Sequence, residues 1–152
     1  MPGYGANPAD TPVTQYDCAY GGNDNQWWRQ ERTRTVVGVS VKSLYQFVDT
    51  KSGYCLDLPG YESATAGSRV SIYPCNSQPW NDNQEWYLED ATGNLEYEIV
   101  NYKNGLCLDV AGWAGDAGNK ANDVPLTVYT CENGGWGGDT PGYDDHLWRL
   151  VP

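Results

Sequence analysis

Residues 53–58 have the sequence GYCLDL and residues 105–110 have the sequence GLCLDV, so one six-residue pattern recurs 52 positions further along the chain. The match extends to both sides. YQFV at 45–48 corresponds to YEIV at 97–100, and Gly60-Tyr61 corresponds to Gly112-Trp113. Similarity at a fixed spacing of this size is the signature of a repeat architecture, in which neighbouring units share a core.

A second pattern, an alternating segment that ends in Tyr-x-Cys, occurs three times, at 13–18, 70–75 and 126–131. Each copy is followed by a four-residue segment that ends in tryptophan: NQWW, NQEW and DHLW. We expect these three tryptophans to lie in one core, because indole rings bury a large apolar area. They are Trp28, Trp86 and Trp148. The third copy also carries a glycine-rich insertion that contains Trp136.

The composition favours an all-β domain. The 152 residues include 18 Gly, 7 Trp and 12 Tyr but only one Phe. Gly, Asn, Asp and Pro recur every few residues, and no long run has apolar residues at helical spacing, which predicts many short strands joined by turns. The length suffices for one domain with its own core. No stretch approaches the roughly 18 apolar residues of a membrane helix, so we expect no membrane insertion.

The charge of the chain excludes some partners. It has 20 acidic and 9 basic side chains, a net charge of −11. Nucleic acids and anionic membrane surfaces are bound by basic patches, so we expect neither as a partner.

The order of these motifs resembles that of a known family. A Cys-Leu-Asp stretch, then Tyr-x-Cys, then Gln-x-Trp, in tandem over essentially the whole chain, is similar to the ricin B-chain lectins and to the xylan-binding modules of secreted hydrolases. The resemblance implies a single β-trefoil domain over 1–152, with repeats at 1–33, 43–92 and 94–152. It implies a secreted lectin module that recognises galactose- or xylan-type glycans and serves as the targeting part of a larger secreted protein.

The first of these repeats is incomplete. Residues 2–18 align without a gap with 59–75, so Met1 corresponds to Leu58. We therefore expect the first repeat to lack its opening strands, its first cysteine and its aspartate. Either the chain is a fragment of a longer protein, or a second chain completes this repeat, because an exposed barrel edge invites pairing with another polypeptide.

The alignment within the resemblance also pairs the cysteines. It implies the disulfides Cys55–Cys75 and Cys107–Cys131, each within one repeat, and leaves Cys18 without a partner. Closing a loop of about 20 residues contributes roughly 3 kcal/mol of stability. Disulfides indicate an oxidising compartment and hence a secreted protein. Metal ligation needs clustered Cys or His at short spacing, which the sequence lacks, so we expect no metal and no cofactor.

A shallow sugar site needs a carboxylate that accepts hydrogen bonds from hydroxyls, a ring for the C–H face and an amide that fixes orientation. By the resemblance, the second repeat supplies all three as Asp57, Tyr73 and Asn83, with Gln84 in support. We expect Asp57 and Tyr73 at the surface. The alternative is that Asp57 caps a turn and Tyr73 is an ordinary strand residue.

The other two repeats depart from this set. The third keeps Asp109 and Tyr129, but Asp145 and His146 replace the Asn-Gln pair. Its site is therefore weaker, altered in specificity or inactive. The first repeat has no carboxylate, so its matching residues form only a vestigial site. Those residues are Tyr16, Asn25 and Gln26.

We expect no enzymatic activity. His146 is the only histidine and falls at a lectin position. No nucleophile elbow, phosphate loop or zinc-protease motif is present in the sequence, although a carboxylate pair for glycoside hydrolysis stays open. The alternative function is that of a structural or adaptor trefoil, which binds a protein partner and has degenerate sugar sites.

Overall fold

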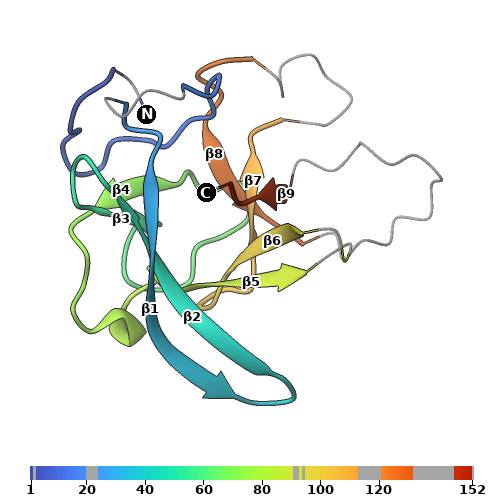
Figure 1. The fold of residues 1–152 in the computed structure, drawn as a ribbon. Coiled ribbons are helices and arrows are strands. Elements are labelled where there is room, and N and C mark those ends of the chain that lie inside the picture. Colours follow the sequence, from blue (N-terminus) through green and yellow to red (C-terminus); the bar gives the residue numbers. More distant parts are fainter. Residues whose placement is uncertain are drawn as a thin grey trace.

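The structure, a computed structural model, describes residues 1, 3–19, 24–90, 93, 95–112, 121–131 and 146–151. These residues form one curled sheet of nine strands and a single 3-10 turn, which confirms the all-β prediction (Figure 1). No helix in these ranges could cross a membrane. In chain order the elements are β1 Trp28–Val37, β2 Val41–Asp49, β3 Cys55–Asp57, β4 Ser71–Tyr73, η1 Pro79–Asn81, β5 Trp86–Asp90, β6 Glu96–Asn101, β7 Cys107–Val110, β8 Leu126–Tyr129 and β9 Leu147–Arg149.

The second and third repeats have the same strand plan. Strands β2 to β5 make the second, and β6 to β9 make the third. In each, the first strand pairs with the last, and the registers are equivalent, since Tyr45 lies opposite Trp86 and Tyr97 lies opposite Trp148. Among the described residues the first repeat contributes only β1 and isolated bridges at Pro12 and Thr14, so it lacks its opening strands, as predicted.

A closed ring of backbone hydrogen bonds joins the three repeats. The amide of Val13 donates to the carbonyl of Val70 (2.9 Å), that of Val70 to Leu126 (3.0 Å) and that of Leu126 back to Val13 (2.8 Å). Each of these residues begins an alternating Tyr-x-Cys segment. The ring shows that the three segments are related by an approximate threefold axis, so the first repeat keeps its place despite its missing strands.

The turn before each segment of the ring repeats as well. Asp10, Gly67 and Asp123 all have positive φ, at 65°, 85° and 66°. Only glycine adopts this conformation without steric cost, although aspartate tolerates it better than most residues. The same backbone conformation at three equivalent positions supports the threefold alignment.

The predicted tryptophans pack in or against the common core. Trp86 is fully buried, whereas Trp28 and Trp148 are partly buried and pack against the cluster. Two of the indoles make the same hydrogen bond, since Trp86 donates to the Leu56 carbonyl at 3.2 Å and Trp148 to the Leu108 carbonyl at 3.0 Å. Each indole therefore locks the last strand of its repeat to the strand that carries the Cys-Leu-Asp stretch.

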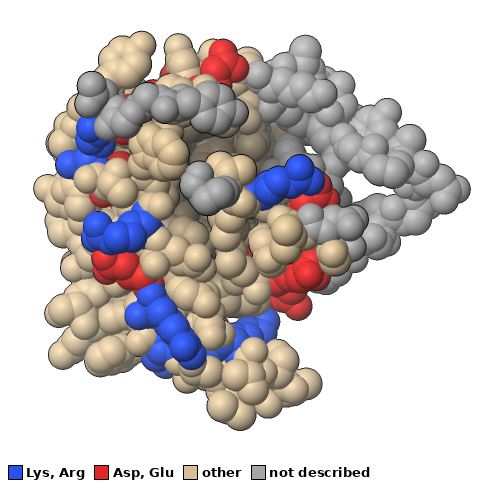
Figure 2. Space-filling view, in the orientation of Figure 1, with Lys and Arg blue, Asp and Glu red and all other residues tan. Residues whose placement is uncertain are grey.

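The longest element is the β1–β2 hairpin, which projects from the body of the molecule (Figure 1). Its base is held by Glu85, whose carboxylate is almost fully buried and accepts from Arg34 Nη2 at 2.6 Å and from the Thr33 hydroxyl at 2.6 Å. Basic and acidic side chains intermingle on the face that Figure 2 presents. The described residues on that face form no patch of a single sign of charge.

Candidate functional site

Both disulfides implied by the alignment are present in the structure. Cys55 is bonded to Cys75 and Cys107 to Cys131, each with a Cα–Cα distance of 5.0 Å. Cys18 is free and exposed. Each disulfide fastens the strand with the Cys-Leu-Asp stretch to the end of its Tyr-x-Cys segment, and so fixes the carboxylate relative to the tyrosine.

The second repeat places Asp57 and Tyr73 on the neighbouring strands β3 and β4. Cys55 lies opposite Tyr73, and Asp57 lies opposite Ser71. The Tyr73 side chain is exposed, as expected, but Asp57 is only 6% exposed, so the expectation that it lies at the surface is wrong. Burial raises the pKa of Asp57 to about 7, against the opposing effect of a hydrogen bond from Gln84.

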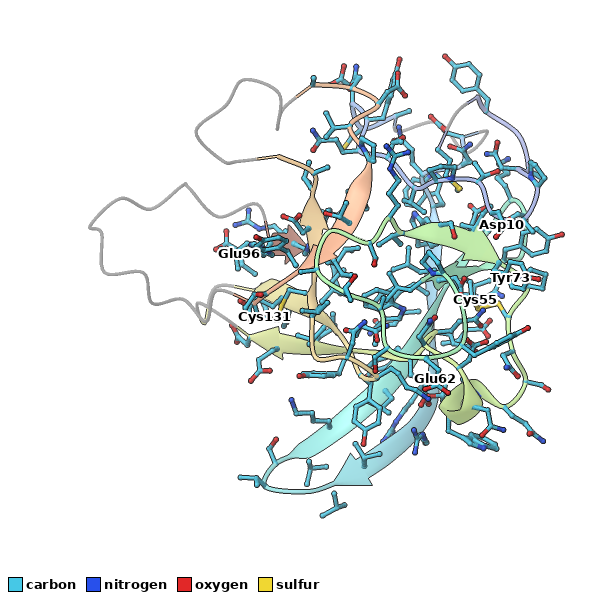
Figure 3. All side chains as sticks on the ribbon, turned by 180° about the vertical axis from the view of Figure 1, so that it is seen from behind. Asp10, Cys55, Glu62, Tyr73, Glu96 and Cys131 are labelled. Carbon is cyan, nitrogen blue, oxygen red and sulfur yellow. A yellow bond between two sulfur atoms is a disulfide. The ribbon has the colours of Figure 1, made fainter. Side chains whose placement is uncertain are left out.

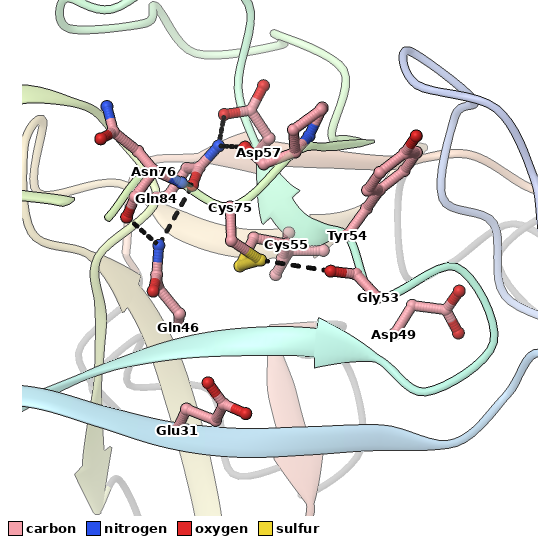
Figure 4. The surroundings of a disulfide bond; sticks show 12 residues. Glu31, Gln46, Asp49, Gly53, Tyr54, Cys55, Asp57, Cys75, Asn76 and Gln84 are labelled. Carbon is pink, nitrogen blue, oxygen red and sulfur yellow. Dashed lines mark hydrogen bonds between the residues drawn. A yellow bond between two sulfur atoms is a disulfide. The ribbon is translucent and has the colours of Figure 1, made fainter. Parts of the chain in front are cut away.

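A relay of buried amides lies beneath this carboxylate (Figure 4). Gln84 Nε2 donates to Asp57 Oδ1 at 3.0 Å and to the Pro74 carbonyl at 3.2 Å. Gln84 Oε1 accepts from Gln46 Nε2 at 3.1 Å and from the Asn76 amide at 2.8 Å. Because Gln84 is fully buried and its polar atoms are satisfied, it holds the Asp57 carboxylate in one orientation.

Gln46 was missed by sequence reasoning. It occupies a strand whose following residues, Phe47 and Val48, are buried, and it is 8% exposed itself. A polar residue that is buried in a strand has hydrogen-bond partners in almost every case. That signal could have indicated a residue beneath the site, although it could not have named the partner.

Asn83 lies beneath the loop that follows Asp57. The side chain is completely buried. Its Nδ2 donates to the carbonyls of Gly60 (2.8 Å) and Glu62 (3.2 Å), and its Oδ1 accepts from the Leu58 amide (3.2 Å). Asn83 therefore shapes the loop beside the carboxylate, and its amide is engaged by the backbone of that loop.

The third repeat has the same strand register as the second, but different side chains surround its aspartate. Asp109 lies opposite Thr127, and Cys107 lies opposite Tyr129, as in the second repeat. Tyr129 is 51% exposed, whereas Asp109 and His146 are almost fully buried. The Thr127 hydroxyl donates to Asp109 Oδ2 at 2.6 Å, and His146 Nε2 lies 3.5 Å from Asp109 Oδ1. Two further residues, Asp145 and Trp136, lie outside the described residues.

Glu98 lies on β6, close to the site of the third repeat. It pairs with Leu147, the neighbour of His146, and is only 2% exposed. Its carboxylate and the sulfurs of Cys107 and Cys131 lie within 4.8 Å of one another. Those sulfurs form a disulfide, and thiolate is the form of cysteine that binds metals, so this group lacks the chemistry of a metal site.

The first repeat keeps the hydrogen bonds that the side-chain amides make in the second repeat. Gln26 Oε1 accepts from the Ala19 amide at 2.7 Å, and its Nε2 donates to the Asp17 carbonyl at 2.8 Å, as Gln84 does with Asn76 and Pro74. The Asn25 amide likewise donates to a loop carbonyl, that of Gly3, at 3.0 Å. Tyr16 is 51% exposed. The described part of this repeat offers no aspartate at the place of Asp57 or Asp109.

The two complete sites lie on different sides of the molecule. Figure 3 shows Tyr73 and Cys55 near one edge and Cys131 near the other. One small ligand therefore cannot contact both sites, whereas a long chain with repeated units could.

Comparison with known proteins identifies the family. The profile of the ricin-type β-trefoil lectin domain-like family matches residues 1–73 and 36–124. The chain belongs to this family, and carbohydrate binding is the general function that this membership supports. A comparison with curated proteins found no match.

Solved structures agree with this assignment. A designed threefold symmetric protein, ThreeFoil, matches with a TM-score of 0.67 and 27% identity over 95% of this chain and 84% of its own. An exo-β-1,3-galactanase from Clostridium thermocellum matches with a TM-score of 0.56 and 25% identity over 82% of this chain, which corresponds to 21% of the galactanase chain. The cytolethal distending toxin of Haemophilus ducreyi, at 18% identity, covers 82% of this chain and 59% of its own with a TM-score of 0.54, and shares the fold.

Proposed function

We propose that this protein binds galactose- or xylan-type glycans, without catalysis, through the site of its second repeat. The observation that carries the proposal is the buried carboxylate of Asp57, which Gln84 holds in place next to the exposed ring of Tyr73. Asn83 and Gln84 act from beneath, by shaping the loop and orienting the carboxylate.

The chemistry of such a site is simple. An ionised carboxylate accepts charge-assisted hydrogen bonds from neighbouring hydroxyls, and an aromatic ring covers the C–H face of the sugar. With few hydrogen bonds and one ring, a single sugar binds weakly, with a Kd on the order of mM. A polysaccharide that engages two sites at once binds more tightly, through the effective concentration of the second site. The third repeat would provide that site through Asp109 and Tyr129.

A targeting role in a secreted protein is part of the same proposal. Two disulfides support an oxidising compartment. The matched region is about a fifth of the galactanase chain, which supports a module that works beside a larger partner domain. That galactanase acts on a galactan, which supports galactose-type glycans as ligands of this chain.

A glycan array with the parent protein and two variants tests the proposal. Asp57→Asn removes the charge while keeping the size of a buried side chain. Asp90→Asn makes the same change at an exposed position on β5, away from the site, and serves as the control. We expect galactose- or xylan-type spots that bind the parent and the control and are lost with Asp57→Asn. An empty array for the parent would contradict the proposal and favour the adaptor function.

A further inference from the structure

The relay beneath the carboxylate differs in kind between the second and third repeats. Gln46 and Gln84 support Asp57 in the second repeat. The equivalent residues in the third are Glu98 and His146, because the equivalent pairs Tyr45–Trp86 and Tyr97–Trp148 place Glu98 beside His146 as Gln46 lies beside Gln84. Two amides, which do not titrate, are thus replaced by two groups that do.

The third-repeat cluster, formed by Glu98, His146 and Asp109, is buried. The three side chains are only 2%, 5% and 6% exposed. His146 Nε2 lies 3.5 Å from Asp109 Oδ1, and Thr127 donates to the other oxygen of Asp109. Burying two ionised carboxylates costs free energy unless a cation or hydrogen-bond donors lie next to them.

The number of donors depends on the protonation of the imidazole. Gln84 can donate to Asp57 and accept from Gln46 at any pH. A neutral imidazole has one N–H, whereas an imidazolium has two. Only the imidazolium can donate to a carboxylate on each side. With both carboxylates ionised, the cationic form also leaves the cluster with the same net charge as the second-repeat relay around ionised Asp57.

We propose that Glu98 is a positioning residue of the third-repeat site, which holds His146 as an imidazolium so that His146 orients the Asp109 carboxylate for a sugar. This inference rests on the proposed carbohydrate function for its consequence, that the third site binds more tightly as the pH falls. Among the described residues, Asp109 on β7 lies 3.5 Å from His146, and Glu98 on β6 is placed next to His146 by the strand register. Arg149 on β9 is engaged by Glu96 at 2.8 Å.

The imidazole can be observed directly, without any sugar. His146 is the only histidine of the chain, so its ring nitrogens give the only imidazole signals in ¹⁵N NMR. At each pH from 5 to 9 these signals report directly whether the ring is an imidazolium or a neutral imidazole. Glu98→Gln removes one carboxylate partner, so the midpoint moves to lower pH by about one unit, which is a tenfold change in proton affinity. Glu96→Gln, on the same strand and in an exposed pair, is the matched control and moves the midpoint by only a few tenths.

This titration decides the inference. A midpoint that is the same in the parent and in Glu98→Gln would overturn it, as would an imidazole that stays neutral from pH 5 upward. Circular dichroism and tryptophan fluorescence check that the variants are folded. His146→Gln provides a second test, because the cationic partner is replaced by the residue of the second repeat, and the pH dependence of stability between pH 5 and 8 then decreases.

Sugar titrations at two pH values test the consequence. In an Asp57→Asn background the remaining binding belongs to the third site, and we expect at least about fivefold tighter binding at pH 5.5 than at pH 8. The double change Glu98→Gln with His146→Gln restores the amide pair of the second repeat, so binding persists and loses this pH dependence. A pH dependence that survives the double change would overturn the inference. Absence of any sugar binding in the parent would instead overturn the proposed function and leave the NMR result intact.

Discussion

The second and third repeats share their backbone arrangement but differ in the side chains beneath the site carboxylate. Both have the same strand register, a disulfide and an indole that donates to the backbone of the Cys-Leu-Asp strand. Beneath the carboxylate, however, the second has two glutamines and the third has a glutamate and a histidine. Strand register, disulfide and indole can therefore stay the same while the side chains beneath the carboxylate change from amides to groups that titrate.

Replacing the core tryptophans should give the largest effects. Trp86→Ala removes a fully buried indole and should lower the free energy of unfolding by about 3–5 kcal/mol. Trp148→Ala should cost less, because this side chain is only partly buried. Urea denaturation of both variants measures the difference. Equal losses would show that the two repeats contribute equally to the core.

The pH dependence of stability should distinguish the second-repeat carboxylate. The pKa of Asp57 is raised from 3.8 to about 7, so the folded protein binds this proton more tightly than the unfolded chain. The resulting stabilisation is fully present below pH 3.8 and is lost as the pH rises through about 7. Chemical denaturation at pH 4.5, 6 and 8 should show a smaller decrease with pH in Asp57→Asn than in the parent. The same decrease in both proteins would contradict the burial of this carboxyl.

The exposed rings should give the smallest effects. Tyr73→Ala and Tyr129→Ala remove the faces expected to stack on a sugar, at a cost in binding of about 0.5–1.5 kcal/mol each, with little change in stability. Isothermal titration with one oligosaccharide measures both. We expect the larger loss for Tyr73, and the reverse order would show that the third site dominates.

The sequence predicted the trefoil, the two disulfides and the missing opening strands because each depends on a pattern that recurs at a fixed spacing. It did not predict the burial of Asp57, nor that Asn83, from a distant part of the sequence, holds the loop after Asp57 through the carbonyls of Gly60 and Glu62. Nor did it reveal the positions of Gln46 and Glu98. Alternation along a strand shows which side chains point inward, whereas the partner of Gln46, Gln84, lies 38 residues further along the chain.

The prediction that Cys18 has no partner within the chain agrees with its free thiol in the structure. We expect non-reduced peptide mapping to find Cys18 free or bonded to another chain. A bond from Cys18 to any of the other four cysteines would contradict the alignment of the repeats. The same experiment tests whether a second chain completes the first repeat.

The carboxylate of the second repeat should be the main sugar-binding group, and paired titrations of Asp57→Asn and Asp109→Asn test this most directly. With one galactose- or xylan-type oligosaccharide at pH 8, Asp57→Asn should lose roughly 1.5–3 kcal/mol, about tenfold or more in affinity, because charge-assisted hydrogen bonds are lost. Asp109→Asn should lose less. Binding by Asp57→Asn equal to that of the parent, together with no binding by Asp109→Asn, would contradict the claim and assign the main site to the third repeat.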